Sequence, residues 1–173
     1  MYPILSDNLF ENEAAIPQNP YELLKTLLSR FPKTVVKNGE QKGETLSAAI
    51  RFYGREVLGK NGASTSAFKN GAANIPATSV NGDLPEEEAM IYPFGIVENL
   101  VSAEDFSADR LSLDGRTGLY EKDSFMLIFA CLGEFTVSHF GGTFRLSAGE
   151  TVFVPADFRI EINGTGKLII AHA

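Results

Sequence analysis

Eight short runs of β-branched and aromatic residues, separated by turn residues, fill the C-terminal half of the chain. Such spacing is typical of a β-sandwich or a β-barrel. The run FMLIFAC at residues 125–131 is apolar at every position, which predicts a central strand buried on both faces. Gly141-Gly142, between two of the runs, predicts a tight hairpin. We expect strands at residues 96–101, 106–113, 125–132, 134–140, 143–146, 151–154, 159–162 and 167–172.

The N-terminal third of the chain has the periodicity of helices. In the first predicted helix, Pro20 occupies the first helical position and apolar residues recur at helical spacing from Leu23 to Phe31. A second helix is predicted over residues 45–58, with Gly54 as an unfavourable interior residue and Gly59 at its C-terminal end. These two helices are expected to pack against the β-rich half or to reach a neighbouring subunit.

The composition between the two halves is that of a loop. Residues 61–84 consist mainly of Gly, Ala, Asn, Ser and Thr, with several Asn-Gly pairs that favour turns. The chain is therefore predicted to comprise a helical N-terminal segment at residues 1–60, a linker or long loop at residues 61–90, and a β-barrel at residues 91–173.

Charge and cysteine content exclude several kinds of partner. The formal net charge is −7 and the Lys and Arg residues do not cluster, so no nucleic-acid partner is expected. No apolar run approaches the roughly 18 residues of a membrane span, and the first ten residues do not resemble a signal peptide. We expect a cytoplasmic protein with no membrane partner. The single cysteine, Cys131, is interpreted as a small buried hydrophobe rather than a nucleophile.

Two separated blocks of sequence carry a family resemblance. The longer block contains ENLVSAEDFSADRLSLDG, LSAGETVFVPA and INGTGKLIIAHA, and the shorter block is VVKNGEQKGETLSAAIRFYGREVLG. In this order they resemble the C-terminal barrel and an N-terminal segment of type I mannose-6-phosphate isomerases, metalloenzymes of the cupin superfamily that interconvert mannose 6-phosphate and fructose 6-phosphate. The resemblance implies a mainly β protein, with a cupin-like jelly-roll barrel at the C-terminus and a small helical N-terminal segment.

The family's catalytic residues belong to the stretch between these blocks. There the family carries a Gln-x-His-Pro segment, a glutamate and a later histidine that hold the metal, and an arginine near the substrate. In this chain the stretch at residues 60–97 contains no histidine, and the only glutamines, Gln18 and Gln41, are not followed by x-His. The resemblance therefore assigns no catalytic, cofactor-binding or metal-binding residue, and no cofactor is expected.

The barrel block also departs from the metal motifs of cupins. Gly149 and Pro155 have the spacing that precedes a metal-binding histidine in cupins, but Ile160 occupies the place of that histidine. Aligning Gly133 with the end of the first cupin motif places residues 119–122 at its His-x-His pair and Met126 at its glutamate. The chain has only two histidines, His139 and His172, whereas a zinc or iron site needs three or four converging ligands.

Charged residues of the β-rich half could support chemistry without a metal. An aldose–ketose isomerase needs a base and a group that polarises the carbonyl oxygen. Basic side chains could also hold a sugar phosphate by charge-assisted hydrogen bonds. Nothing in the spacing distinguishes these residues from the solvated faces of alternating strands, which is the interpretation we favour. The basic candidates are Arg145, Arg159 and Lys167, and the candidate bases are Glu134 and Glu161.

Three hypotheses for function follow. The chain is a shortened relative of mannose-6-phosphate isomerase, without metal-dependent activity, whose barrel is a binding or interaction module. Alternatively, it is an active sugar-phosphate isomerase whose site is assembled differently, for example between subunits. The third hypothesis is a structural or regulatory partner of a full-length isomerase, with the leucine stripe at Leu23–Phe31 as its contact surface. The expected partners are a sugar phosphate and a second copy of the chain.

Overall fold

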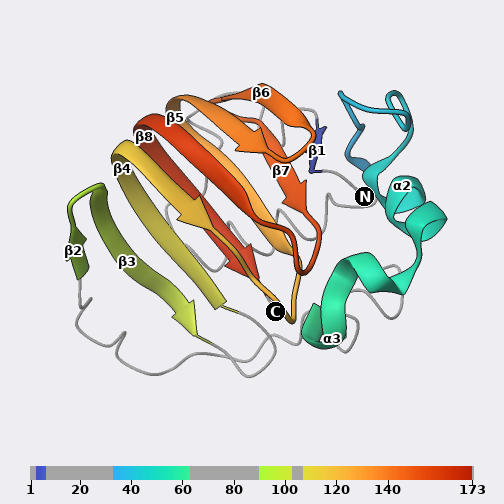
Figure 1. Cartoon of the computed structure of the whole chain (residues 1–173), viewed down its shortest axis with the longest axis horizontal. Coiled ribbons are helices and arrows are strands. Elements are labelled where there is room, and N and C mark those ends of the chain that lie inside the picture. The colour runs from blue at the N-terminus through green and yellow to red at the C-terminus, as the bar shows by residue number, and fades with distance from the viewer. Residues whose placement is uncertain (1–2, 7–32, 63–89, 103–106, 173) are drawn as a thin grey trace.

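The strands form one antiparallel sheet, shown in Figure 1. The computed structural model describes residues 3–6, 33–62, 90–102 and 107–172. The sheet has the order β1-β7-β5-β8-β4-β3-β2, and β6 pairs with the second half of β5. The helices are α2 (Leu46–Tyr53), the 3-10 helix η3 (Arg55–Leu58) and α3 (Gly59–Gly62). The strands are β1 (Ile4–Ser6), β2 (Met90–Tyr92), β3 (Gly95–Ser102), β4 (Ser107–Leu119), β5 (Met126–His139), β6 (Gly142–Ser147), β7 (Thr151–Val154) and β8 (Ile160–His172).

Three long strands fold this sheet over on itself. β4, β5 and β8 have 13, 14 and 13 residues, and Figure 1 shows them curling over near their midpoints, so that each contributes to two layers. Gly133 lies at the bend of β5 with φ +96°, and a Cβ atom there would stand 2.2 Å from the Thr165 carbonyl oxygen. Glycine is the residue that tolerates both conditions. A β-bulge between Ala130 and Leu132 adds to the bend. The curled sheet is a cupin-like barrel.

The space between the two layers is an apolar core. Alternate residues of each strand point to opposite faces, and the inward set is almost entirely aliphatic. Both halves of the bent strands contribute to the same cluster, because the bend turns their inner faces toward one another. The buried members are Leu111, Leu113, Met126, Ile128, Ala130, Phe135, Val137, Leu146, Val152, Val154, Ile160, Ile162, Leu168 and Ile170.

A second apolar cluster covers the outer face of one layer. The N-terminal segment packs there through Val36, α2 and η3, against outward side chains of β5, β7 and β8 such as Phe129, Phe153 and Ile169. The first half of β5 is consequently buried on both faces. The prediction that FMLIFAC forms a central strand is therefore confirmed.

Polar contacts fix the N-terminal segment to the edge of the sheet. β1 pairs with β7, and the Ser6 hydroxyl donates a hydrogen bond to the Thr151 carbonyl oxygen at 3.0 Å. Lys37 forms an ion pair with Glu150, whose other carboxylate oxygen accepts a hydrogen bond from the Ser147 amide at 2.9 Å. Glu150 of the Gly149-Glu150 motif thus has a structural role in joining the segment to the barrel.

The strand predictions from residue 96 onward are correct in location but wrong in where some strands end. The runs at 125–132 and 134–140 form the single strand β5, and those at 159–162 and 167–172 form β8, because a glycine in an extended, bent backbone does not interrupt the ladder. The hairpin is confirmed, with His139 opposite Gly142, so its turn residues are Phe140 and Gly141. β1 and β2 were not predicted.

The helix predictions are only partly tested. The helix expected over residues 45–58 ends at Gly54, which has φ 84°, and η3 and α3 follow it. The N-cap Thr45 accepts a hydrogen bond from the Ala48 amide at 3.1 Å. The helix predicted around Leu23–Phe31 and nearly all of the predicted linker lie outside the described residues, so the division into domains stays a prediction. In the described ranges, no helix is long and apolar enough to cross a membrane.

Candidate functional site

Two of the positions that cupin motifs assign to metal ligands lie in the apolar core, whereas Tyr120, in the stretch assigned to the His-x-His pair, is 44% exposed. Met126 and Ile160 are 3% and 2% exposed and belong to the same buried cluster. Met126 stands opposite Val154 on one side and His172 on the other, and Ile160 stands opposite Leu119. Alkyl and thioether side chains do not bind zinc or other divalent cations of this kind. Among the described residues, no three His, Cys, Asp or Glu side chains are close enough to hold a metal ion. These positions therefore do not fit a cupin metal.

The two histidines are each engaged in local contacts. His172, near the end of β8, has its Nε2 atom 2.8 Å from the Ser107 hydroxyl, directly across the β4–β8 ladder. His139 accepts a hydrogen bond from the Gly141 amide at Nδ1, 3.0 Å away, and its ring centroid lies 5.9 Å from those of Phe144 and Phe158. Partial burial lowers the pKa of His139. Both imidazoles take part in the packing of strand ends.

Arg159, one of the predicted phosphate-binding residues, lies in an acidic rim. Its guanidinium carbon is 5.3 Å from the ring centroid of Tyr120, whose hydroxyl donates a hydrogen bond to Asp157 at 2.5 Å. That hydrogen bond, desolvation and the nearby charges of Asp157 and Asp123 raise the pKa of Tyr120, against the opposing charge of Arg159. Because two carboxylates face this cluster, it is a poor place for an anion.

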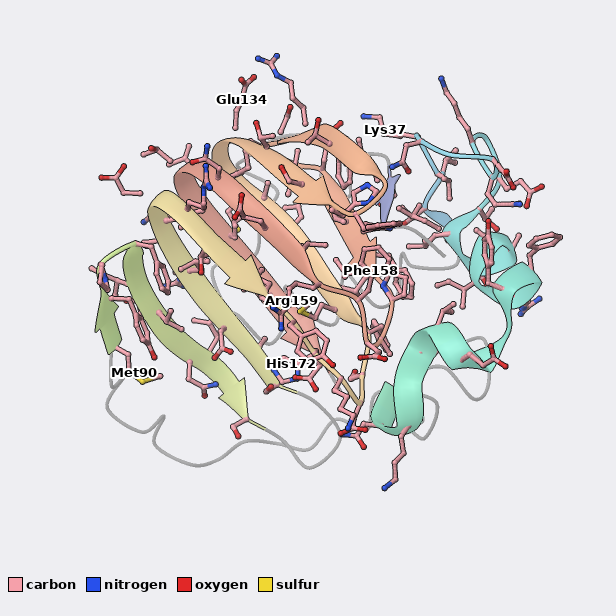
Figure 2. The ribbon with its side chains drawn as sticks, viewed as in Figure 1. Lys37, Met90, Glu134, Phe158, Arg159 and His172 are labelled. Atoms are coloured by element: carbon pink, nitrogen blue, oxygen red, sulfur yellow. The ribbon has the colours of Figure 1, made fainter. Side chains whose placement is uncertain are left out.

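The other predicted residues of the second layer form exposed ion pairs. Arg145 lies 3.8 Å from Glu134, and Arg116 lies 3.4 Å from Glu161. Figure 2 shows Glu134 projecting away from the barrel at the folded edge of the sheet. These side chains lie on solvated strand faces, as the alternation of the strands predicts.

Lys167 has a different environment, on the outer face of the first layer. It stands opposite Ser112 of β4 on one side and Leu132 of β5 on the other. Arg110 lies two residues before Ser112 and therefore on the same face, where its Nη1 atom donates a hydrogen bond to Glu98 at 3.2 Å. The structure thus places two cations and a hydroxyl on adjacent strands.

The thiol of Cys131 lies near both of these cations. Burial raises the pKa of Cys131 to about 11, and the charges of Arg110 and Lys167 oppose that effect. Both cations are therefore within electrostatic reach of the thiol. Sequence reasoning selected Lys167 but missed Arg110 and Ser112, because only the β4–β8 register brings these three residues together.

A family model identifies the β-rich half of the chain. Residues 96–173 match the family model described as mannose-6-phosphate isomerase, cupin domain. Among solved structures, a mutant of phosphomannose isomerase from Salmonella typhimurium is similar with 19% sequence identity and a TM-score of 0.43, over 50% of this chain and 22% of that one. The mannose 6-phosphate isomerase of the same organism, bound to fructose 6-phosphate and zinc, gives 21% identity and a TM-score of 0.43 over 49% of this chain and 22% of that one.

The apo form of that enzyme gives 21% identity and a TM-score of 0.42 over the same shares of the two chains. The matched part of this chain therefore spans only about a fifth of these isomerases, 22% of their length. No curated protein matches the sequence.

Proposed function

Because residues 96–173 match the family model of the mannose-6-phosphate isomerase cupin domain, we propose that this chain is a non-catalytic relative of those enzymes, in which the barrel is a binding or interaction module. The observation that carries the proposal is the stretch at residues 60–97, where the family resemblance places the metal ligands and where this chain has no histidine. The hydrocarbon interior of the barrel offers no substitute site. Met126 and Ile160 lie where a cupin would present metal ligands, and both pack among aliphatic side chains.

The chemistry of isomerisation supports the same conclusion. Moving a proton between adjacent carbons of a sugar needs a base and a Lewis acid or cation at the carbonyl oxygen, and both must reach one substrate. In the described part of the chain, the carboxylates Glu134 and Glu161 are exposed partners of arginines, and neither faces the barrel interior. A degenerate active site is the result that this arrangement supports.

The ligand class that we propose for the module is a sugar phosphate. Such a ligand, fructose 6-phosphate, is bound in the similar isomerase from Salmonella typhimurium. Binding needs only a phosphate-recognising surface and does not need the metal. A chain with a single cysteine forms no intramolecular disulfide, which is compatible with the reducing cytoplasm that we propose for it.

A direct test combines turnover with metal content. The chain is purified without a histidine tag, its metals are quantified by mass spectrometry, and conversion of mannose 6-phosphate to fructose 6-phosphate is followed in a coupled assay with and without added Zn²⁺. A full-length phosphomannose isomerase serves as the positive control. We expect turnover at the buffer background under both conditions, and substoichiometric metal.

Turnover that requires a stoichiometric metal and disappears with a chelator would contradict this proposal. It would favour the alternative of an active isomerase with a differently assembled site. Turnover that survives the chelator would contradict it as well, because the chain would then isomerise sugars without a metal.

A further inference from the structure

We propose that the outer face of the first layer carries a binding site for the phosphate group of a sugar phosphate, formed by Arg110, Ser112 and Lys167. The inference rests on the proposed function in one respect. A barrel whose interior is filled with hydrocarbon must bind its ligand on a surface, and this is the surface whose chemistry suits a phosphate monoester.

The strand register defines the geometry of the site. Ile96 of β3, Ser112 of β4, Lys167 of β8 and Leu132 of β5 are successive partners across the sheet and form one row on its outer face. Neighbouring strands lie about 4.8 Å apart, so the side chains of Ser112 and Lys167 leave the sheet close enough together to contact one phosphate group. Arg110 lies on β4 two residues before Ser112, and its side chain is therefore on the same face.

The charges on this face favour an anion, although the whole chain has a net charge of −7. Glu98 is the carboxylate that pairs with Arg110, through one of the five N–H donors of the guanidinium. Lys167 forms no ion pair with any residue that the structure describes. Two further carboxylates lie in the next row toward the bend, Asp114, which accepts a hydrogen bond from the Thr165 hydroxyl at 3.1 Å, and Glu134, which pairs with Arg145. Two cations thus face one directly paired carboxylate, and the remaining donors are available for phosphate oxygens.

The flanks of the row suit the sugar portion of such a ligand. Ile96 is 39% exposed and Leu132 is 50% exposed, at opposite ends of the row. Exposed aliphatic side chains on either side of a hydroxyl and an ammonium offer surface to the C–H groups of a sugar ring. The cluster of Tyr120 and Arg159 has no comparable arrangement, because the charges of Asp157 and Asp123 also act on the Tyr120 ring that Arg159 covers. The outer-face row is therefore the better phosphate site of the two.

The test is a titration followed by the amide NMR spectrum of the full chain. Mannose 6-phosphate, inorganic phosphate and mannose are added separately to the wild type and to three variants, Arg110→Met, Lys167→Met and Arg145→Met. The last is the matched control, because it removes an exposed arginine charge on β6 in the second layer. Ser112→Ala, which changes no charge, is a fourth variant with little effect on folding.

We expect mannose 6-phosphate and inorganic phosphate to shift the amide signals of Ser112 and Lys167, whereas mannose alone does not. Loss of a hydrogen bond to a charged group should weaken mannose 6-phosphate binding about tenfold or more in the Arg110 and Lys167 variants. The Arg145 variant should bind within about twofold of the wild type, since this charge is exposed, screened by solvent and already paired with Glu134. Added salt should weaken binding of both phosphates.

Three results would overturn the site. They are the absence of shifts with either phosphate, an equal loss of affinity in the Arg145 control, and equal shifts with mannose alone. The outcome is separable from that of the proposed function. Isomerase turnover by the wild type would refute the non-catalytic assignment and leave these shifts unaffected, whereas absent shifts without turnover would refute only the phosphate site.

Discussion

Replacing Leu46 with alanine should destabilise the whole barrel, although the residue belongs to the N-terminal segment. Leu46 is the first residue of α2, is 1% exposed, and lies in the outer apolar cluster with Phe129 and Phe153 of the sheet. Truncation of a buried leucine costs about 2–5 kcal/mol, because transfer free energy is lost and a cavity remains. For a chain of this length each kcal/mol lowers the melting temperature by about 2–4 °C, so a decrease of about 4–20 °C is expected.

Phe52→Ala provides the matched control in the same helix. Phe52 is 72% exposed, and its ring makes an edge-to-face contact with the neighbouring Tyr53. Its replacement should change the free energy of unfolding by no more than about 0.5 kcal/mol. Both variants keep the capping hydrogen bond between Thr45 and the Ala48 amide, so helix capping does not confound the comparison.

Differential scanning calorimetry of the three proteins in one buffer decides the question. One cooperative transition that moves down only in the Leu46 variant would indicate that the segment and the barrel share a core. The reasoning is refuted if the main transition stays in place while a separate, weaker transition is lost, because the segment would then unfold independently. It is also refuted if both variants shift the transition equally.

Two further predictions concern the bend of β5 and the half-buried thiol of Cys131. Gly133→Ala should lower the free energy of unfolding in urea by about 2 kcal/mol or more, because the new Cβ atom would lie 2.2 Å from the Thr165 carbonyl oxygen. Gly39→Ala is the control, because Gly39 also has a positive φ but no atom within 4 Å of a Cβ, and it should lower the free energy of unfolding less. Equal effects of the two substitutions would exclude the clash as the cause. Burial raises the pKa of Cys131 from 9.0 to about 11, so its alkylation by iodoacetamide should be slow at pH 8, rise until about pH 11, and level off near pH 9 only in the unfolded chain. An alkylation rate of the folded chain that levels off near pH 9 would contradict the raised pKa. The protonated thiol also stabilises the folded chain, and this stabilisation is present below the pKa of the unfolded state and is lost as the pH rises through the pKa of the folded state.

The fold could be predicted as far as local patterns determine it. The apolar run from Phe125 to Cys131 indicated a strand buried on both faces, and the sheet order places it at the centre. The sequence pattern predicts that a strand ends at Gly133, because a sequence does not show whether a glycine ends a strand or bends it. The long-range ladder to β8 decides this, since it continues on both sides of the glycine. β1 was missed because three residues are too few to show an alternating pattern.

The candidate site could not be predicted to the same degree. Local sequence identified Lys167 as a cation on a strand, but nothing near it in the chain indicated Arg110, which lies far away in sequence. The two residues share a face only because β4 and β8 pair in a specific register. Conversely, Arg159 and Lys167 look equivalent in the sequence, but the structure places Arg159 over Tyr120, a side chain that also interacts with Asp157 and Asp123.

Because side chains alternate between the two faces of β4, substitutions on one face should affect ligand binding and those on the other should affect stability. Leu111 and Leu113 point into the core, whereas Arg110 and Ser112 point outward from the same strand. Substitutions at Arg110 or Lys167 should therefore alter phosphate binding and change stability by no more than about 0.5 kcal/mol, as is usual for surface positions. Replacement of the buried Ile160 by valine should instead lower stability by about 0.5–1.5 kcal/mol and leave binding unchanged. A barrel with a catalytic interior could not separate the two properties in this way, because its ligands would project from the same inward positions that form the core.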